Sequence, residues 1–98
     1  MVKHPAPSRQ TTGEYLLNLA TGHLTRETAA RWAEVWVAEV DGAEDVRDPL
    51  VWQALLNLAG ADLQTSPSEY LHSDADFHDW LAKFDSAILE TEKNDRDP

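Results

Sequence analysis

Apolar side chains recur at spacings of three and four residues in several segments of the chain, which is the pattern of amphipathic helices. The first segment runs from about Thr12 to Thr21, and Gly22 follows it as a left-handed helix stop. The second begins after Thr25, a typical capping residue, and continues towards Gly42. Its apolar stripe consists of Ala29, Trp32, Ala33, Trp36, Val37 and Val40. These segments predict a short helix followed by a longer one.

A third helix is predicted after the acidic connector at residues 39–48, which we expect to be a solvated loop. Asp48 is a capping residue, and Pro49 is tolerated at the first helical position, so the helix starts here and ends at Gly60. Its apolar stripe consists of Val51, Trp52, Leu55, Leu56 and Ala59.

The last predicted helix starts after Ser73, where Asp76 completes a capping box, and ends near Thr91. Its apolar stripe consists of Phe77, Trp80, Leu81, Phe84 and Ile88, with Leu89 beside it. No strand-like alternation of useful length occurs. The pattern therefore predicts an all-α fold, a small bundle of four amphipathic helices.

A short extra helical turn is predicted near 67–71, because Ser66 and Glu69 have the spacing of a capping box. The two ends of the chain are polar and carry few apolar side chains. The predicted organisation is a flexible arm at 1–11, one helical domain at 12–91 and a frayed acidic tail at 92–98.

The length and the aromatic content allow one hydrophobic core. A chain of 98 residues is the usual size of a single domain. Four tryptophans occur, and each lies on an apolar stripe: Trp32, Trp36, Trp52 and Trp80. They could line an aromatic ligand cage, but their stripe positions favour packing in the core.

The charge balance is strongly acidic, with 18 acidic and 8 basic side chains and a net charge of −10. Binding to nucleic acid or to an anionic membrane depends on Lys and Arg. This balance therefore predicts that the partner is a basic protein, with no nucleic acid and no membrane. The chain has no cysteine, its start MVKHPAPSRQTT has no apolar export segment, and we expect a cytoplasmic protein.

Acidic residues dominate the middle of the chain, because no Lys or Arg lies between Arg47 and Lys83. Acidic side chains around an aromatic anchor are typical of surfaces that capture basic partners. The alternative is a face that only keeps the protein soluble. The predicted partner-binding residues are Glu39, Asp41, Glu44, Asp45, Glu69, Tyr70, Asp74, Asp76 and Asp79.

His72, Asp74, Asp76 and His78 lie within seven residues, which is a possible set of metal ligands. Acidic residues in a first helical turn also stabilise the helix dipole without a metal, and the spacing matches no known ligand motif. We therefore predict no metal site and no cofactor. Without a catalytic motif the chain is predicted not to be an enzyme, and a metal-dependent enzyme using His72 and His78 is the remaining catalytic alternative.

The segment EYLLNLATGHLTRETAARWAEVWV, within residues 12–40, resembles the opening of bacterial colicin-immunity-like helical proteins. The resemblance implies an inhibitor that binds a basic toxin domain, such as a nuclease, in the cytoplasm of the producing cell. The Tyr-containing turn that such proteins use would correspond to Glu69 and Tyr70 with Asp74 and Asp76. The leading hypothesis is an immunity or antitoxin-type inhibitor. The alternative is a structural or regulatory adaptor that self-associates or binds a partner through apolar helix surface.

Overall fold

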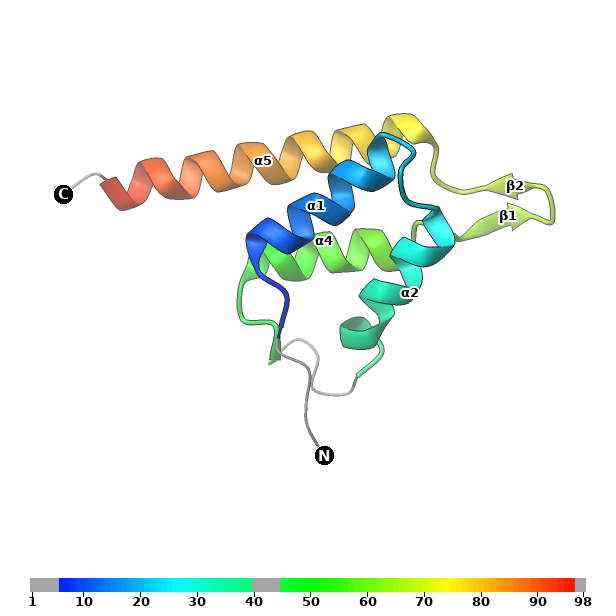
Figure 1. Ribbon diagram of the computed structural model, residues 1–98, viewed down its shortest axis with the longest axis horizontal. Coiled ribbons are helices and arrows are strands. Elements are labelled where there is room, and N and C mark those ends of the chain that lie inside the picture. Colours follow the sequence, from blue (N-terminus) through cyan, green and yellow to red (C-terminus); the bar gives the residue numbers. More distant parts are fainter. Residues whose placement is uncertain (1–5, 40–44, 97–98) are drawn as a thin grey trace.

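Four helices and one β-hairpin make up the part of the chain that the computed structural model describes, residues 6–39 and 45–96 (Figure 1). The helices are α1 (Arg9–Ala20), α2 (Arg26–Val37), α4 (Pro49–Ala59) and α5 (Asp74–Arg96). The hairpin consists of β1 (Gln64–Ser66) and β2 (Glu69–Tyr70) and connects α4 to α5. The four helices confirm the predicted fold class.

Local capping explains where the helices start. The side chains of Ser8, Thr25 and Asp48 accept hydrogen bonds from backbone N–H groups in the first turns of α1, α2 and α4. At the start of α5, the backbone N–H of Ser73 donates to the Asp76 carboxylate at 3.0 Å. The predicted caps at Thr25 and Asp48 are therefore confirmed, and at Ser73 the structure shows the half of the predicted capping box that Asp76 supplies.

Three helix boundaries differ from the prediction. Helix α2 ends at Val37 and does not continue towards Gly42, and the predicted stripe residue Val40 lies outside the described residues. Helix α1 starts at Arg9, within the segment predicted as a flexible arm, because Ser8 supplies a cap that the apolar pattern does not reveal. Helix α5 continues past Thr91 to Arg96. The remainder of the predicted arm at 1–5 and the end of the tail at 97–98 lie outside the described residues.

Helix α4 is the centre of the packing, with α2, α1 and α5 all in contact with it, while α1 also packs along α5. Its residues Leu55 and Leu58 are completely buried. From α5, Phe77 and Phe84 close the core, and the end of α5 extends past the other helices in Figure 1. The four tryptophans pack against this core and are partly buried.

The segment near 67–71 is part of a β-hairpin, so the predicted helical turn is wrong. Gln64 pairs with Tyr70 in antiparallel register, and the backbone N–H of Leu71 donates to the carbonyl of Leu63 at 2.8 Å. One isolated helical turn would form few hydrogen bonds for the residues it orders. Pro67 and Ser68 favour a tight turn instead, which lets the flanking residues pair.

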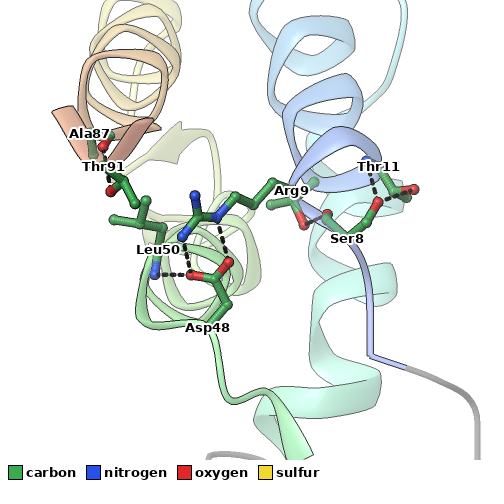
Figure 2. Close-up of polar contacts among 8 residues, drawn as sticks. Ser8, Arg9, Thr11, Asp48, Leu50, Ala87 and Thr91 are labelled. Atoms are coloured by element: carbon green, nitrogen blue, oxygen red, sulfur yellow. Dashed lines mark hydrogen bonds and ion pairs between the residues drawn. The ribbon is translucent and has the colours of Figure 1, made fainter. Parts of the chain in front are cut away.

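The connector before α4 is not wholly solvated, which corrects the prediction for residues 39–48. Val46 is buried in the core, and Asp48 bonds to Arg9 of α1 in addition to capping α4 (Figure 2). Arg9 Nε donates to one oxygen of Asp48 and Nη2 donates to the other at 3.3 Å. This ion pair ties the starts of α1 and α4 together. Residues 40–44 of the connector lie outside the described part.

Within the described ranges, no helix has the length and the apolar character that crossing a membrane requires.

Candidate functional site

Charge is distributed unevenly along the chain. Residues 1–39 contain four basic and four acidic side chains, whereas residues 40–98 contain four basic and fourteen acidic ones. The whole net charge of −10 therefore belongs to the second part. The connector, the hairpin and α5 are acidic and α4 carries no charged side chain, while α1, α2 and the turn between them are close to neutral.

Helix α2 has one face in the core and one face in solvent. Ala29, Ala30 and Ala33 are buried, and these small side chains bring the helix close to its neighbours. The exposed positions recur at each helical turn on the opposite face. They are Glu27, Thr28, Arg31, Glu34 and Val35.

Arg31 lies in the middle of this exposed face, one turn after Glu27. Glutamate four residues before a basic residue is a favourable spacing for an ion pair on a helix. Among the residues that the structure describes, Arg31 nevertheless has no ion pair and no side-chain hydrogen bond. Its guanidinium is available to a partner.

Arg26, at the start of α2, is used differently. Its guanidinium lies over the ring of Tyr70 at 3.9 Å from the ring centre and 5.0 Å from that of Phe77. Its Nη1 donates to the backbone carbonyl of His72 at 2.8 Å, and Nη2 lies 3.9 Å from the Asp74 carboxylate. Arg26 therefore holds the hairpin and the start of α5 against the start of α2.

Glu27 is engaged by the same hairpin. The hydroxyl of Tyr70 donates to Glu27 Oε1 at 2.7 Å. This hydrogen bond is the main cause that lowers the pKa of the Glu27 carboxyl, aided by the backbone N–H of Glu27 and by Arg26. The same bond raises the pKa of the Tyr70 hydroxyl, because the neighbouring carboxylate disfavours a second negative charge.

The structure brings some of the predicted partner-binding residues together and separates others. Glu69 and Tyr70 lie on β2, next to the start of α5 with Asp74 and Asp76, whereas Glu39 follows α2. Asp79 is paired with Lys83 on α5 at 2.9 Å. Asp41 and Glu44 lie outside the described residues, and Asp45 lies in the connector. Tyr70, the predicted anchor, has its hydroxyl bonded inside the molecule.

The predicted absence of a metal site concerns His72, Asp74, Asp76 and His78. Nδ1 of His72 lies 3.4 Å from the Asp76 carboxylate, which already accepts the N–H of Ser73. Over the described ranges, no three His, Cys, Asp or Glu side chains converge in a way that could hold a metal ion. The aromatic ring of His72 instead packs against Trp80.

Sequence reasoning missed Arg26 and Arg31. Both lie in a segment with equal numbers of acidic and basic side chains, so neither composition nor charge runs distinguish them. The signal that could have identified Arg31 is its position on the side of α2 opposite the apolar stripe. Thr28 and Val35, seven positions apart, lie on the same exposed face.

Comparison with known proteins identifies relatives of the chain. The model of the YxzC family, described as YxzC DNA-binding protein, matches residues 10–84. The uncharacterized protein YxzC of Bacillus subtilis (strain 168) is 37% identical over 67 residues, which are 68% of this chain and 53% of that protein. The chain thus spans about half the length of the curated relative it matches. No solved structure shows a significant match.

These findings overturn the colicin-immunity resemblance and the inhibitor hypothesis, together with its adaptor alternative. The resemblance was wrong because a short helix, a glycine turn and a capped amphipathic helix occur in many unrelated helical proteins. The expected basic toxin partner and the exclusion of nucleic acid are also wrong by the description of the matching family. The exclusion failed because a net charge sums over the whole chain, whereas a partner meets one face of it.

Proposed function

The chain belongs to the YxzC DNA-binding protein family, and from this premise we propose that it binds double-stranded DNA through the exposed face of α2. Family membership is the observation that carries the proposal. The choice of α2 rests on Arg31, which is exposed and has no ion pair among the described residues.

The arrangement of α1 and α2 supports this choice. The two helices are joined by five residues, and Gly22 in this turn has the positive φ of 83° that a sharp change of direction uses. In helix–turn–helix proteins, the second helix enters the major groove, and residues near its start contact base edges. Helix α2 is the second helix here, and Thr28 and Arg31 lie in its first two turns.

The uneven charge gives the complex an orientation. Phosphate groups repel the acidic second part of the chain, so the nearly neutral first part faces the DNA. A carboxylate-rich surface turned away from the duplex costs little, since charges beyond about 10 Å are largely screened at ordinary salt. With few cations to displace counterions, affinity depends more on base contacts than in a basic protein.

Arginine is the side chain best suited to such a contact, because its guanidinium pairs with two acceptors of guanine in the major groove. Arg31 would make this contact, and Thr28 would contact a base or a phosphate one turn earlier. The proposal involves no catalytic step and no cofactor. The absence of enzyme activity and the absence of a cofactor stay predictions. As part of the same proposal, the protein works in the cytoplasm of a bacterial cell, where a chromosome is accessible to it.

The proposal is tested by fluorescence anisotropy with labelled duplexes of about 20 base pairs, selected from fragmented bacterial chromosomal DNA by repeated binding at about 50 mM salt. Arg31→Ala should weaken binding to a selected duplex about tenfold. Arg47→Ala is the matched control, because Arg47 is also exposed and unpaired among the described residues but precedes α4 in the acidic part. It removes the same charge and should change the affinity much less.

Two outcomes contradict the proposal in different ways. If the protein selects no duplex and binds none at low salt, DNA binding by this chain is wrong. If Arg31→Ala and Arg47→Ala weaken binding equally, DNA binding stands but α2 is not the contacting element.

A further inference from the structure

One side chain of the hairpin, that of Tyr70, makes two separate contacts with the proposed DNA-binding helix α2. The ring of Tyr70 lies under the guanidinium of Arg26, and its hydroxyl donates to the carboxylate of Glu27. These contacts link residues that are 43 and 44 positions apart in the sequence. The two contacted residues are consecutive and lie in the first helical turn of α2, and Arg31 lies in the next helical turn.

Glu27 has two competing partners within reach of its position on α2. Arg31 follows it by four residues, the spacing at which glutamate and a basic side chain pair on a helix surface. Tyr70 reaches it from the hairpin and is the partner that the structure shows, at 2.7 Å. Arg26, the other cation of this part of α2, is held by Tyr70, His72 and Asp74.

We propose that Tyr70 is a positioning residue for DNA binding: its hydroxyl holds Glu27 so that Arg31, one turn further along α2, remains unpaired and free to contact DNA. The inference rests on the proposed function and names a role for the hairpin within it. Tyr70 itself touches no DNA in this scheme. It acts by deciding which partner Glu27 takes.

The physical argument is a competition on a solvated surface. A carboxylate that already accepts a hydrogen bond from a phenol is a weaker partner for a second donor, and its side chain is fixed in one orientation. Without the hydroxyl, Glu27 can turn along the helix towards Arg31. A guanidinium paired with a carboxylate must break that pair before it can bind a base or a phosphate, so DNA affinity falls.

The test removes the hydroxyl and keeps the ring. Tyr70→Phe retains the aromatic face under Arg26, so the hairpin stays docked and the fold is kept. An ion pair of this kind on a helix surface corresponds to about a twofold change in an equilibrium. Tyr70→Phe should therefore weaken binding to a selected duplex about twofold at low salt, and circular dichroism and thermal unfolding should show an intact fold.

Making Tyr70→Phe in two variant backgrounds, in addition to the wild type, separates a positioning role from a general structural effect. In a Glu27→Gln background the carboxylate is absent, so Tyr70→Phe should leave the affinity unchanged. In an Arg31→Ala background the proposed contact is absent, and Tyr70→Phe should again have no effect. Each comparison is made within its own background, because Glu27→Gln also removes a negative charge near the DNA.

The outcomes distinguish this inference from the proposed function. If wild type binds a duplex and Arg31→Ala weakens binding, but Tyr70→Phe does not, the role of Tyr70 is wrong while DNA binding by α2 stands. If Tyr70→Phe weakens binding to the same extent in all three backgrounds, Tyr70 acts by another route and the inference is also wrong. If wild type binds no DNA, both fail together.

Discussion

At the scale of single residues, Asp48 combines a local role with a long-range one. Its carboxylate accepts the backbone N–H of Leu50 at 3.0 Å, which caps α4, and it also accepts the guanidinium of Arg9 from α1. Figure 2 shows both contacts converging on the same carboxylate. One side chain therefore sets the start of the central helix and the position of its neighbour.

Replacement of Asp48 separates these two roles. Asp48→Ala removes the cap and the ion pair, and should lower the free energy of unfolding by about 1–2 kcal/mol. Asp48→Asn keeps a good capping side chain and loses the ion pair, whose partners are partly exposed, so its cost should stay below about 1 kcal/mol. Urea unfolding followed by tryptophan fluorescence measures both values. Equal losses for the two variants would show that the cap contributes nothing.

The difference in the free energy of unfolding between wild type and Asp48→Asn should depend on pH. Partial burial raises the pKa of Asp48, but the hydrogen bonds from Arg9, Leu50 and Val51 outweigh it, and the folded-state pKa lies below the ordinary value of 3.8. A lowered folded-state pKa stabilises the fold above the unfolded value. The advantage of wild type over Asp48→Asn should therefore be complete at neutral pH. It should disappear as the pH falls from 3.8 through the lower folded-state pKa.

At the scale of elements, the turn between α1 and α2 depends on its backbone conformation. Gly22 has a φ of 83°, where a side chain would be strained, and an added Cβ would meet no neighbouring atom. The turn also carries Thr25, the cap of the next helix. The direction in which α2 leaves α1 is thus set by a glycine and a cap within four residues.

Gly22→Ala should lower the free energy of unfolding by about 1 kcal/mol, because the cost comes from the backbone alone. Gly60→Ala is the control: Gly60 lies at the end of α4 with a φ of −92°, which any residue adopts. Its new methyl group would meet the flexible end of Leu63 at 3.4 Å, and we expect a smaller change. Thermal unfolding followed by circular dichroism compares the two variants. A larger loss for Gly60→Ala would contradict the assigned role of Gly22.

At the scale of the whole molecule, the separation of charge matters more than its sum. The ten excess carboxylates all belong to residues 40–98, and the described part of that region contains few basic side chains to balance them. These carboxylates repel one another in the folded state and also repel DNA. Dissolved salt screens both repulsions, but it also screens the attraction between the cationic Arg31 and the anionic DNA.

Stability and DNA affinity should therefore respond to salt in opposite directions. Between about 50 mM and 200 mM salt, the urea midpoint should rise, while the DNA affinity should fall with a slope of only about −1 to −3 in log–log form, because few cations displace counterions. Urea titrations and anisotropy titrations over the same range measure the two trends. A slope near −10, typical of many phosphate contacts, would show that a basic surface outside α2 binds the DNA.

Much of the helical architecture was predictable because it depends on neighbours along the chain. The caps at Thr25 and Asp48 and the bond from the Ser73 N–H to Asp76 act over two or three residues, and the apolar stripes repeat within each helix. The fold class follows from these short-range patterns. The hairpin was missed because the same Ser, Pro and Glu spacing fits either a helix start or a turn, and only pairing between Gln64 and Tyr70 decides between them.

The candidate site depends on contacts that no local pattern contains. Tyr70 meets Arg26 and Glu27 across more than forty residues, and Arg9 meets Asp48 across 39. Composition specifies how many charges the protein carries, but the folded chain determines which of them neutralise each other and which face solvent. Arg26 and Arg31 lie on the same helix with the same charge, yet packing of the hairpin engages Arg26, whereas Arg31 has no partner within the described ranges. That difference arises from tertiary structure, because a charged side chain can pair only with a group that the fold brings within reach.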